Sequence, residues 1–210
     1  MKIIAHRGFW INAHEKNSYT AFEQSFQNGF GVETDIRDFD GQLVISHNLA
    51  NCACMTLDIF LQLYVKYSSQ PKLALNIKAD GLQAILENKL NLFRVENYFV
   101  FDMAVPDGLG YLRRGMKTYT RQSEYEAIPP YYEKADGVWL DEFDGHWLTD
   151  DIIEQHLSAG KSVCIVSPEL HGRSFKKEWE HYRELEKEIG RDRLMLCTDL
   201  PEQAKEFFNA

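Results

Sequence analysis

Short apolar runs alternate with amphipathic segments along almost the whole chain. Eight runs have the composition of buried strands: Lys2–Ala5, Val32–Arg37, Leu73–Ile77, Tyr98–Phe101, Lys117–Thr120, Gly137–Leu140, Ser162–Val166 and Leu194–Cys197. Segments with helical character lie between or after them: Ser18–Gln27, Leu57–Lys66, Leu82–Lys89, Gly108–Arg113, Glu124–Ala127, Thr149–Leu157, Lys176–Glu188 and Glu202–Phe208. This alternation predicts parallel strands joined by crossover helices. Eight such units in 210 residues favour a compact (β/α)8 TIM-type barrel over an open sheet.

The chain shows no linker, repeat or low-complexity tract, so we expect one barrel domain over residues 1–210. Its formal net charge of −9 disfavours nucleic acid as a partner. An anionic substrate would therefore need a local cluster of positive charge. The chain begins directly with a strand-like run and has no apolar stretch of about 18 residues. We expect no membrane span and, by default, a cytoplasmic location; nothing in the sequence indicates an oligomeric state.

Polar side chains stand where the first three predicted strands end, which is where TIM barrels place their chemistry. They are His6 and Arg7 on the first strand, Glu33 and Asp35 on the second, and Asn76 and Lys78 on the third. Strand side chains alternate between faces, so Glu33 and Asp35 share a face, as do Asn76 and Lys78. Two carboxylates and one amide oxygen form a site that suits Mg²⁺ or Ca²⁺ better than zinc.

A hairpin is predicted after the second strand, because Asp40-Gly41 separates two apolar runs. Counting outward from this turn places His47 opposite Thr34, close to the level of Glu33 and Asp35. Strict register would point His47 to the other face, so we expect a bulge that turns it toward the metal face. His6 and His47 could then flank one metal as an acid–base pair.

These motifs together resemble the glycerophosphodiester phosphodiesterase family, a TIM-barrel superfamily that also includes the sphingomyelinase D toxins. The resemblance rests on Ile-Ala-His6-Arg7-Gly8, Asn17-Ser18-Tyr19-Thr20-Ala21-Phe22, Gly31-Val-Glu33-Thr-Asp35-Ile, Asp40-Gly41-Gln42-Leu-Val-Ile-Ser-His47, Leu75-Asn76-Ile-Lys78 and Cys197-Thr198-Asp199-Leu200-Pro201. The motifs are dense over the first 80 residues and return on the last strand.

The resemblance implies a metal-dependent phosphoric diester hydrolase of lipid metabolism that acts on a small or lipid-derived phosphodiester. It assigns general acid and base catalysis to His6 and His47. Glu33 and Asp35 would bind a divalent cation, Mg²⁺ or Ca²⁺, with Asn76 as the third ligand, and Arg7 and Lys78 would hold the phosphate.

Three positions depart from the family pattern. Asn76 stands where many members have an acidic metal ligand, Asn48 where Asp usually follows the histidine, and Lys16 where an acidic residue normally precedes Asn17. Only 28 residues separate His47 from Asn76, so the family's usual insertion after the second strand is missing. The insertion helps to cover the glycerol pocket, and its absence puts the glycerol moiety in question.

Other predicted strand exits supply candidates for a substrate pocket. We name Trp10, Glu142, Glu169 and His171 first, and Asp102, Arg121 and Asp141 beside them. Trp139 lies on a predicted strand and fits the core equally well.

Two alternatives stay open. A phospholipase D-like lyase would stop at a cyclic phosphate, and a weakened or non-catalytic relative would only bind phosphate. Asn76, Asn48 and Lys16 favour the weakened relative, whereas the presence of both His6 and His47 speaks against it.

Overall fold

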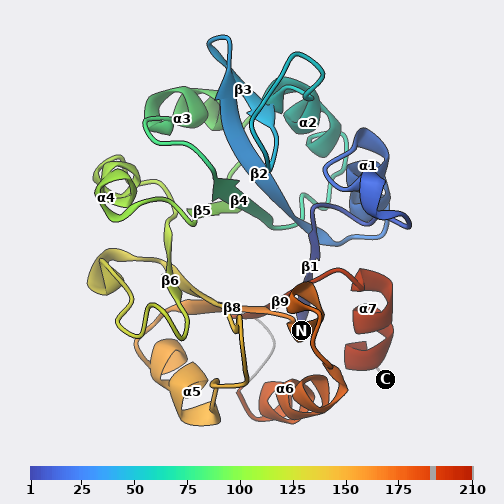
Figure 1. Cartoon of the computed structure of the whole chain (residues 1–210), viewed down its shortest axis with the longest axis vertical. Coiled ribbons are helices and arrows are strands. Elements are labelled where there is room, and N and C mark those ends of the chain that lie inside the picture. The colour runs from blue at the N-terminus through green and yellow to red at the C-terminus, as the bar shows by residue number, and fades with distance from the viewer. Residues whose placement is uncertain (190–192, 210) are drawn as a thin grey trace.

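Eight parallel strands curl into a barrel, and helices surround it (Figure 1). The computed structural model describes residues 1–189 and 193–209. Neighbouring strands follow the order β5-β4-β2-β1-β9-β8-β7-β6. Their bounds are β1 (Lys2–His6), β2 (Gly31–Phe39), β4 (Leu73–Ile77), β5 (Tyr98–Phe101), β6 (Tyr119–Gln122), β7 (Gly137–Leu140), β8 (Ser162–Val166) and β9 (Leu194–Thr198). The predicted TIM-type barrel is confirmed.

The two ends of this strand order meet between β5 and β6. An isolated parallel bridge pairs Val100 with Thr118, and the Val100 N–H donates to the Lys117 carbonyl at 2.9 Å. This junction brings the carboxyl ends of all eight strands into one ring, where side chains from distant parts of the sequence can meet.

Seven helices are described between or after these strands. They are α1 (Tyr19–Gln27), α2 (Leu57–Tyr64), α3 (Gln83–Leu92), α4 (Val105–Arg113), α5 (Asp150–Ser158), α6 (Lys176–Ile189) and α7 (Pro201–Asn209). Three short 3-10 turns accompany them, η1 (Ala13–Glu15), η2 (Tyr132–Lys134) and η3 (Pro168–His171). Within the described ranges, no helix has the length and apolar character that crossing a bilayer requires.

The predicted helix over Glu124–Ala127 is wrong. After β6 the chain makes a tight turn, in which Ser123 and Glu126 exchange backbone hydrogen bonds of 3.4 and 3.1 Å. Four residues are too few to stabilise a helix alone, and Pro129 and Pro130 prevent its extension. The barrel therefore lacks an α-helix between β6 and β7.

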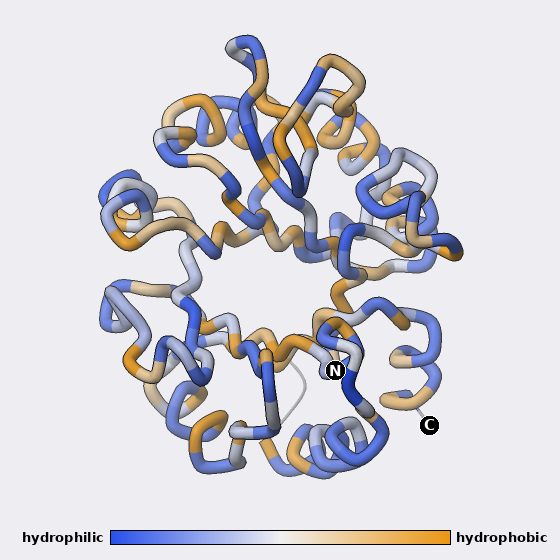
Figure 2. The backbone as a smooth tube through the Cα atoms, in the orientation of Figure 1, coloured by the Kyte–Doolittle hydropathy of each residue, from blue (hydrophilic) through white to orange (hydrophobic). Residues whose placement is uncertain are grey.

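The ring of strands separates an apolar core inside the barrel from apolar clusters outside it. The interior is filled by strand side chains, including two aromatic stacks, Phe99 on Tyr119 at 3.8 Å and Phe101 on Trp139 at 4.0 Å between ring centroids. Two further apolar clusters pack helices against the outside of the strands. Figure 2 shows the matching pattern, with many apolar positions along the strands and mixed colours on the surrounding helices. Because aromatic rings fill the barrel, the space that remains along its axis lies near its ends.

The Asp40-Gly41 turn joins β2 to the antiparallel strand β3 (Gln42–Ile45). The register is the predicted one, with Phe39 opposite Gln42 and Ile36 opposite Ile45. The Ser46 N–H continues it by donating to the Asp35 carbonyl at 3.0 Å. The expected bulge is wrong, because β3 ends before His47 and the chain simply leaves the sheet there.

Gly8 follows β1 in the left-handed region, with φ of 88°. A Cβ atom at this position would lie 2.8 Å from the Ala21 Cβ and 2.9 Å from the Ala21 carbonyl carbon of α1. We expect Gly8→Ala to lower the free energy of unfolding by about 2–4 kcal/mol, through backbone strain and overpacking. Urea denaturation measures this loss.

Gly145→Ala is the matched control, since its added Cβ would meet nothing within 4 Å. Equal stability of the two variants would contradict this account of the close packing between β1 and α1.

Candidate active site

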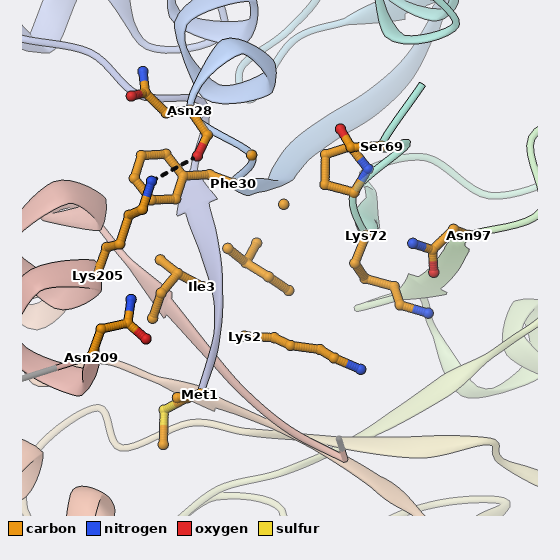
Figure 3. Close-up of a pocket in the computed structure, with 14 residues that line it drawn as sticks. Met1, Lys2, Ile3, Asn28, Phe30, Ser69, Lys72, Asn97, Lys205 and Asn209 are labelled. Atoms are coloured by element: carbon orange, nitrogen blue, oxygen red, sulfur yellow. Dashed lines mark hydrogen bonds between the residues drawn. The ribbon is translucent and has the colours of Figure 1, made fainter. Parts of the chain in front are cut away.

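Two cavities mark the two ends of the barrel. The cavity at the amino-terminal end, of about 400 Å³, is shown in Figure 3, where Lys72 and Lys205 lie near Asn28, Asn97 and Asn209. No His, Asp or Glu is among the described residues that line it. Among the described residues, this end therefore lacks the histidines and carboxylates of the predicted reaction centre.

The cavity at the carboxyl end is smaller, about 240 Å³, but it is lined by histidine, carboxylate, arginine and lysine side chains. Seven of the eight barrel strands, all except β9, contribute to its lining, either directly or through the loops that follow them. The lining comprises His6, Arg7, Glu33, His47, Asn76, Lys78, Phe101, Asp102, Arg121, Trp139, Asp141, Phe143, Val166, Leu170 and His171. Six of the seven residues predicted at the reaction centre are thus brought together, and Asp35 lies directly behind them.

His6 is held by a carboxylate from the other end of the chain. Its Nδ1 lies 2.6 Å from Asp199 Oδ1, and Lys16 donates to Asp199 Oδ2 at 3.1 Å. Burial acts to raise the pKa of Asp199, but the hydrogen bond and charge of His6, together with Lys16, lower it below its ordinary value. An ionised Asp199 holds the proton on Nδ1 of His6, which leaves Nε2 as a proton acceptor.

Glu33 lies at the floor of the cavity beside Asn76. The Asn76 amide donates to Glu33 Oε1 at 3.2 Å, and the Arg7 N–H donates to Oε2 at 3.3 Å. Nε2 of His6 lies 3.9 Å from Oε2. Burial and the neighbouring Asp35 carboxylate raise the pKa of Glu33 to about 7. A bound cation would offset this repulsion and favour the ionised form.

Asp35 is completely buried behind the cavity wall. Asn17 donates to its Oδ2 at 2.8 Å, and Arg7 Nε lies 3.2 Å from the same atom. Lys78 Nζ lies 3.8 Å from Oδ1, which has no hydrogen-bond partner. Asp35 therefore anchors Arg7 and Lys78, the two cations predicted to hold phosphate.

The oxygen atoms around Glu33 fit a hard cation. Asp35 Oδ1 and Asn76 Oδ1 are both buried acceptors without a hydrogen-bond donor. Three or more His, Cys, Asp or Glu side chains grouped for a metal do not occur within the described ranges. A cation here would need the Asn76 oxygen, and water or substrate phosphate would complete its coordination.

His47 occupies an exposed position at the cavity rim. It follows the end of β3, and its Nδ1 lies 3.2 Å from Asn48 Oδ1. The same histidine also lines an adjacent open groove next to Arg7 and Lys16. The predicted pair His6 and His47 therefore share one cavity but have different surroundings.

The opposite wall carries a second group of charges. His171 Nε2 lies 2.7 Å from Asp141 Oδ1, and Lys78 donates to Asp102 at 2.9 Å. Arg121 forms ion pairs with Asp102 and with Glu126. The predicted pocket residue His171 thus lines the cavity together with Asp102, Arg121 and Asp141.

Trp10, Glu142 and Glu169 do not line the cavity. Trp10 donates from its indole to the His6 carbonyl at 3.1 Å. Glu142 is completely buried and accepts the Trp147 and Leu148 N–H groups at 2.8 and 2.9 Å. Glu169 accepts the Asp199 N–H at 3.2 Å. The two carboxylates satisfy backbone donors in the loops, a role that a single sequence does not reveal.

Asp199 and Asn17 are the contributors that the sequence prediction did not assign to the site. Thr34 donates to Asn17 Oδ1 at 2.9 Å, which orients the amide that binds Asp35. Both residues stand in motifs that carried the family resemblance, and Asp199 directly follows the last strand. The available signal was the strand exit for Asp199 and the shared motif for Asn17.

Solved structures share this fold along the whole chain. The fold is that of glycerophosphodiester phosphodiesterases. A candidate member of that family from Galdieria sulphuraria has a TM-score of 0.78 at 18% identity, and the match covers 100% of this chain and 98% of the other. The glycerophosphodiester phosphodiesterase from Agrobacterium tumefaciens gives 0.74 at 16% identity, with 100% of both chains covered.

A phosphodiesterase from Oleispira antarctica, solved with the product sn-glycerol-3-phosphate, gives a TM-score of 0.72 at 15% identity. Its match covers 100% of this chain and 97% of the other. No protein-family model and no curated protein matches the sequence.

Proposed function

We propose that this protein is a phosphodiesterase that hydrolyses a small, glycerophosphodiester-like substrate in the cavity at the carboxyl end of the barrel. One observation carries the proposal: the His6–Asp199 pair stands beside Glu33, within the same cavity as Arg7 and Lys78. His6 can accept a proton, Glu33 is a buried carboxylate, and the remaining two side chains are cations that can stabilise a phosphate. Phosphoryl transfer uses groups of these kinds. The motif resemblance and the shared fold support the same activity.

The cavity itself encloses a small group, and the adjacent open groove, which shares Arg7 and His47 with it, leaves room for a larger part of the substrate outside. The cavity volume of about 240 Å³ suits a phosphodiester with short alcohol groups, or the head group of a lipid whose remaining part stays outside. Arg7 and Lys78 would receive the phosphate, because both line the cavity and their positive charge is oriented by the buried Asp35. We therefore propose these two side chains as the phosphate-binding pair.

Glu33, Asp35 and Asn76 are the residues that we propose to hold a divalent cation, Mg²⁺ or Ca²⁺. Such an ion would supply Lewis-acid stabilisation of negative charge on the phosphoryl oxygens. His6 would accept the proton of the attacking hydroxyl or water on Nε2, with Asp199 stabilising the resulting imidazolium. The second proton-transfer group has two candidates that line the cavity, the predicted His47 and His171.

A chromogenic assay tests the proposed function. We expect the protein to release 4-nitrophenol from bis(4-nitrophenyl) phosphate with Mg²⁺, Mn²⁺ or Ca²⁺, and EDTA to abolish the release. The monoester 4-nitrophenyl phosphate should remain intact, since the proposal concerns diesters. Faster cleavage of the monoester, or a rate that is indifferent to EDTA, would contradict it.

Metal affinity should respond to the charge at position 76. We expect Asn76→Asp to tighten Ca²⁺ and Mn²⁺ binding about tenfold, because a carboxylate would replace a neutral amide beside Glu33. Isothermal titration calorimetry measures this without relying on catalysis. Glu33→Gln should weaken binding in the same experiment.

Asn48→Asp provides the matched control, since it adds the same charge in the exposed loop at the rim. If Asn76→Asp and Asn48→Asp change the affinity equally, position 76 is not a ligand.

A further inference from the structure

The cavity contains a second histidine held by a carboxylate, and it comes from the loop that follows β8. His171 ends the η3 turn after β8, and its Nε2 lies 2.7 Å from Asp141 Oδ1 at the end of β7. The ring also packs against Phe143, with 5.0 Å between centroids. Both His171 and Asp141 line the cavity, and their side chains are 23% and 10% exposed. The pair thus repeats the arrangement of His6 with Asp199.

His47 lacks these features. It lies in an exposed loop, and its ring nitrogen faces the neutral amide of Asn48 at 3.2 Å. An amide cannot stabilise an imidazolium by charge, whereas a carboxylate does. Since an effective general acid must hold its proton and be fixed in direction, His171 is better equipped for this role than His47.

The charges that face His171 favour its protonated form. The hydrogen bond from Asp141 raises the pKa of His171 above its ordinary value, and burial opposes this rise. The charge of Asp141 and that of Glu124 also raise it, while Arg173 lowers it. With Nε2 engaged by Asp141, Nδ1 is the nitrogen that remains for the substrate.

His6 and His171 reach the cavity from different strands of the barrel. The attacking and leaving oxygens lie on opposite sides of the phosphorus in phosphoryl transfer. His6 ends β1, whereas His171 follows β8, which β9 separates from β1, and Asp141 follows β7, the next strand around the barrel. His47 follows the hairpin on β2, which is adjacent to β1.

We propose that His171, held by Asp141, donates the proton to the leaving alcohol when the diester is cleaved, an inference that rests on the proposed phosphodiesterase function. A bond forms between the attacking oxygen and phosphorus, and the proton of the attacking group passes to His6 Nε2. The bond from phosphorus to the leaving oxygen breaks with its electron pair. That oxygen takes the proton from Nδ1 of the His171 imidazolium.

Two substrates that differ only in the leaving group test this role. Glycerol 3-phosphate can be esterified with ethanol, whose oxygen needs a proton to leave, or with 4-nitrophenol, whose oxygen leaves without one. We expect His171→Gln to lower kcat/KM for the ethyl ester by about 10²–10⁴-fold and for the 4-nitrophenyl ester by less than about tenfold. Asp141→Asn should show the same selectivity to a smaller extent, and it serves as the second variant if His171→Gln does not fold.

The outcomes distinguish this inference from the proposed function. His181→Gln, on the exposed side of α6, controls for the loss of a histidine that forms an ion pair with Asp150. Equal losses on both esters in the His171 and Asp141 variants would overturn the acid role while leaving the phosphodiesterase in place. If His47→Gln instead loses activity mainly on the ethyl ester, His47 is the residue that donates the proton. If the unmodified protein cleaves neither ester, both proposals fail.

Discussion

Replacing His6 by alanine is expected to lower kcat on an alkyl phosphodiester about a thousandfold, the largest activity loss among single substitutions in the cavity. The reason is geometric, because His6 is bonded to the carboxylate of Asp199 at 2.6 Å and lies 3.9 Å from Glu33. Loss of the ring removes the proton acceptor and leaves Asp199 with Lys16 as its remaining charged partner. Steady-state kinetics at saturating substrate measure the effect.

One further variant tests the role of Asp199, and another is a control for the loss of a histidine. Asp199→Asn keeps the size of the side chain but removes its charge, so it should lose less activity than His6→Ala and shift the pH profile. His181→Ala should retain ordinary activity, since His181 lies on α6 and pairs with Asp150 at 2.6 Å. If His6→Ala keeps more than about a tenth of the activity, His6 is not the base.

Replacing Asp35 by alanine is expected to cost about 3 kcal/mol in the free energy of unfolding, the largest stability loss among the charged residues of the site. Its carboxylate is completely buried and interacts with Arg7 at 3.2 Å, Lys78 at 3.8 Å and the Asn17 amide at 2.8 Å. Removing it leaves two cations close together and one donor without an acceptor. Urea denaturation, monitored by circular dichroism, gives the value.

Asp38→Ala is the control for Asp35→Ala, because Asp38 lies on the same strand but is exposed. We expect its effect to stay within about 0.5 kcal/mol. A loss below about 1 kcal/mol for Asp35→Ala would mean that the buried carboxylate does not hold Arg7 and Lys78 in place.

The regular part of the fold follows from local patterns. Alternating apolar runs predicted all eight barrel strands, and the Asp-Gly turn predicted the register of β2 and β3. The same reasoning failed at Glu124–Ala127, where four residues of helical composition precede two prolines and the chain turns back instead. Short segments carry too little local energy to determine their own conformation.

The features of the site that the sequence could not predict were missed for a different physical reason. Alternation of strand faces predicted that Glu33, Asn76 and Lys78 meet in one cavity. It could not show that Lys16 pairs with Asp199, because 183 positions separate them and only the closed barrel brings them together. Nor could it distinguish Glu142, which satisfies loop N–H groups, from Asp141, which holds His171 in the cavity.

Product analysis by ³¹P NMR shows whether this protein hydrolyses a phosphodiester. We expect the protein with a divalent cation to convert the resonance of an alkyl glycerophosphodiester into that of a phosphomonoester. His6→Ala should leave the diester unchanged under the same conditions. A cyclic phosphate that accumulates and persists would show a lyase in place of a hydrolase. A diester resonance that remains unchanged with the unmodified protein would contradict the assignment of phosphodiester hydrolysis to this cavity.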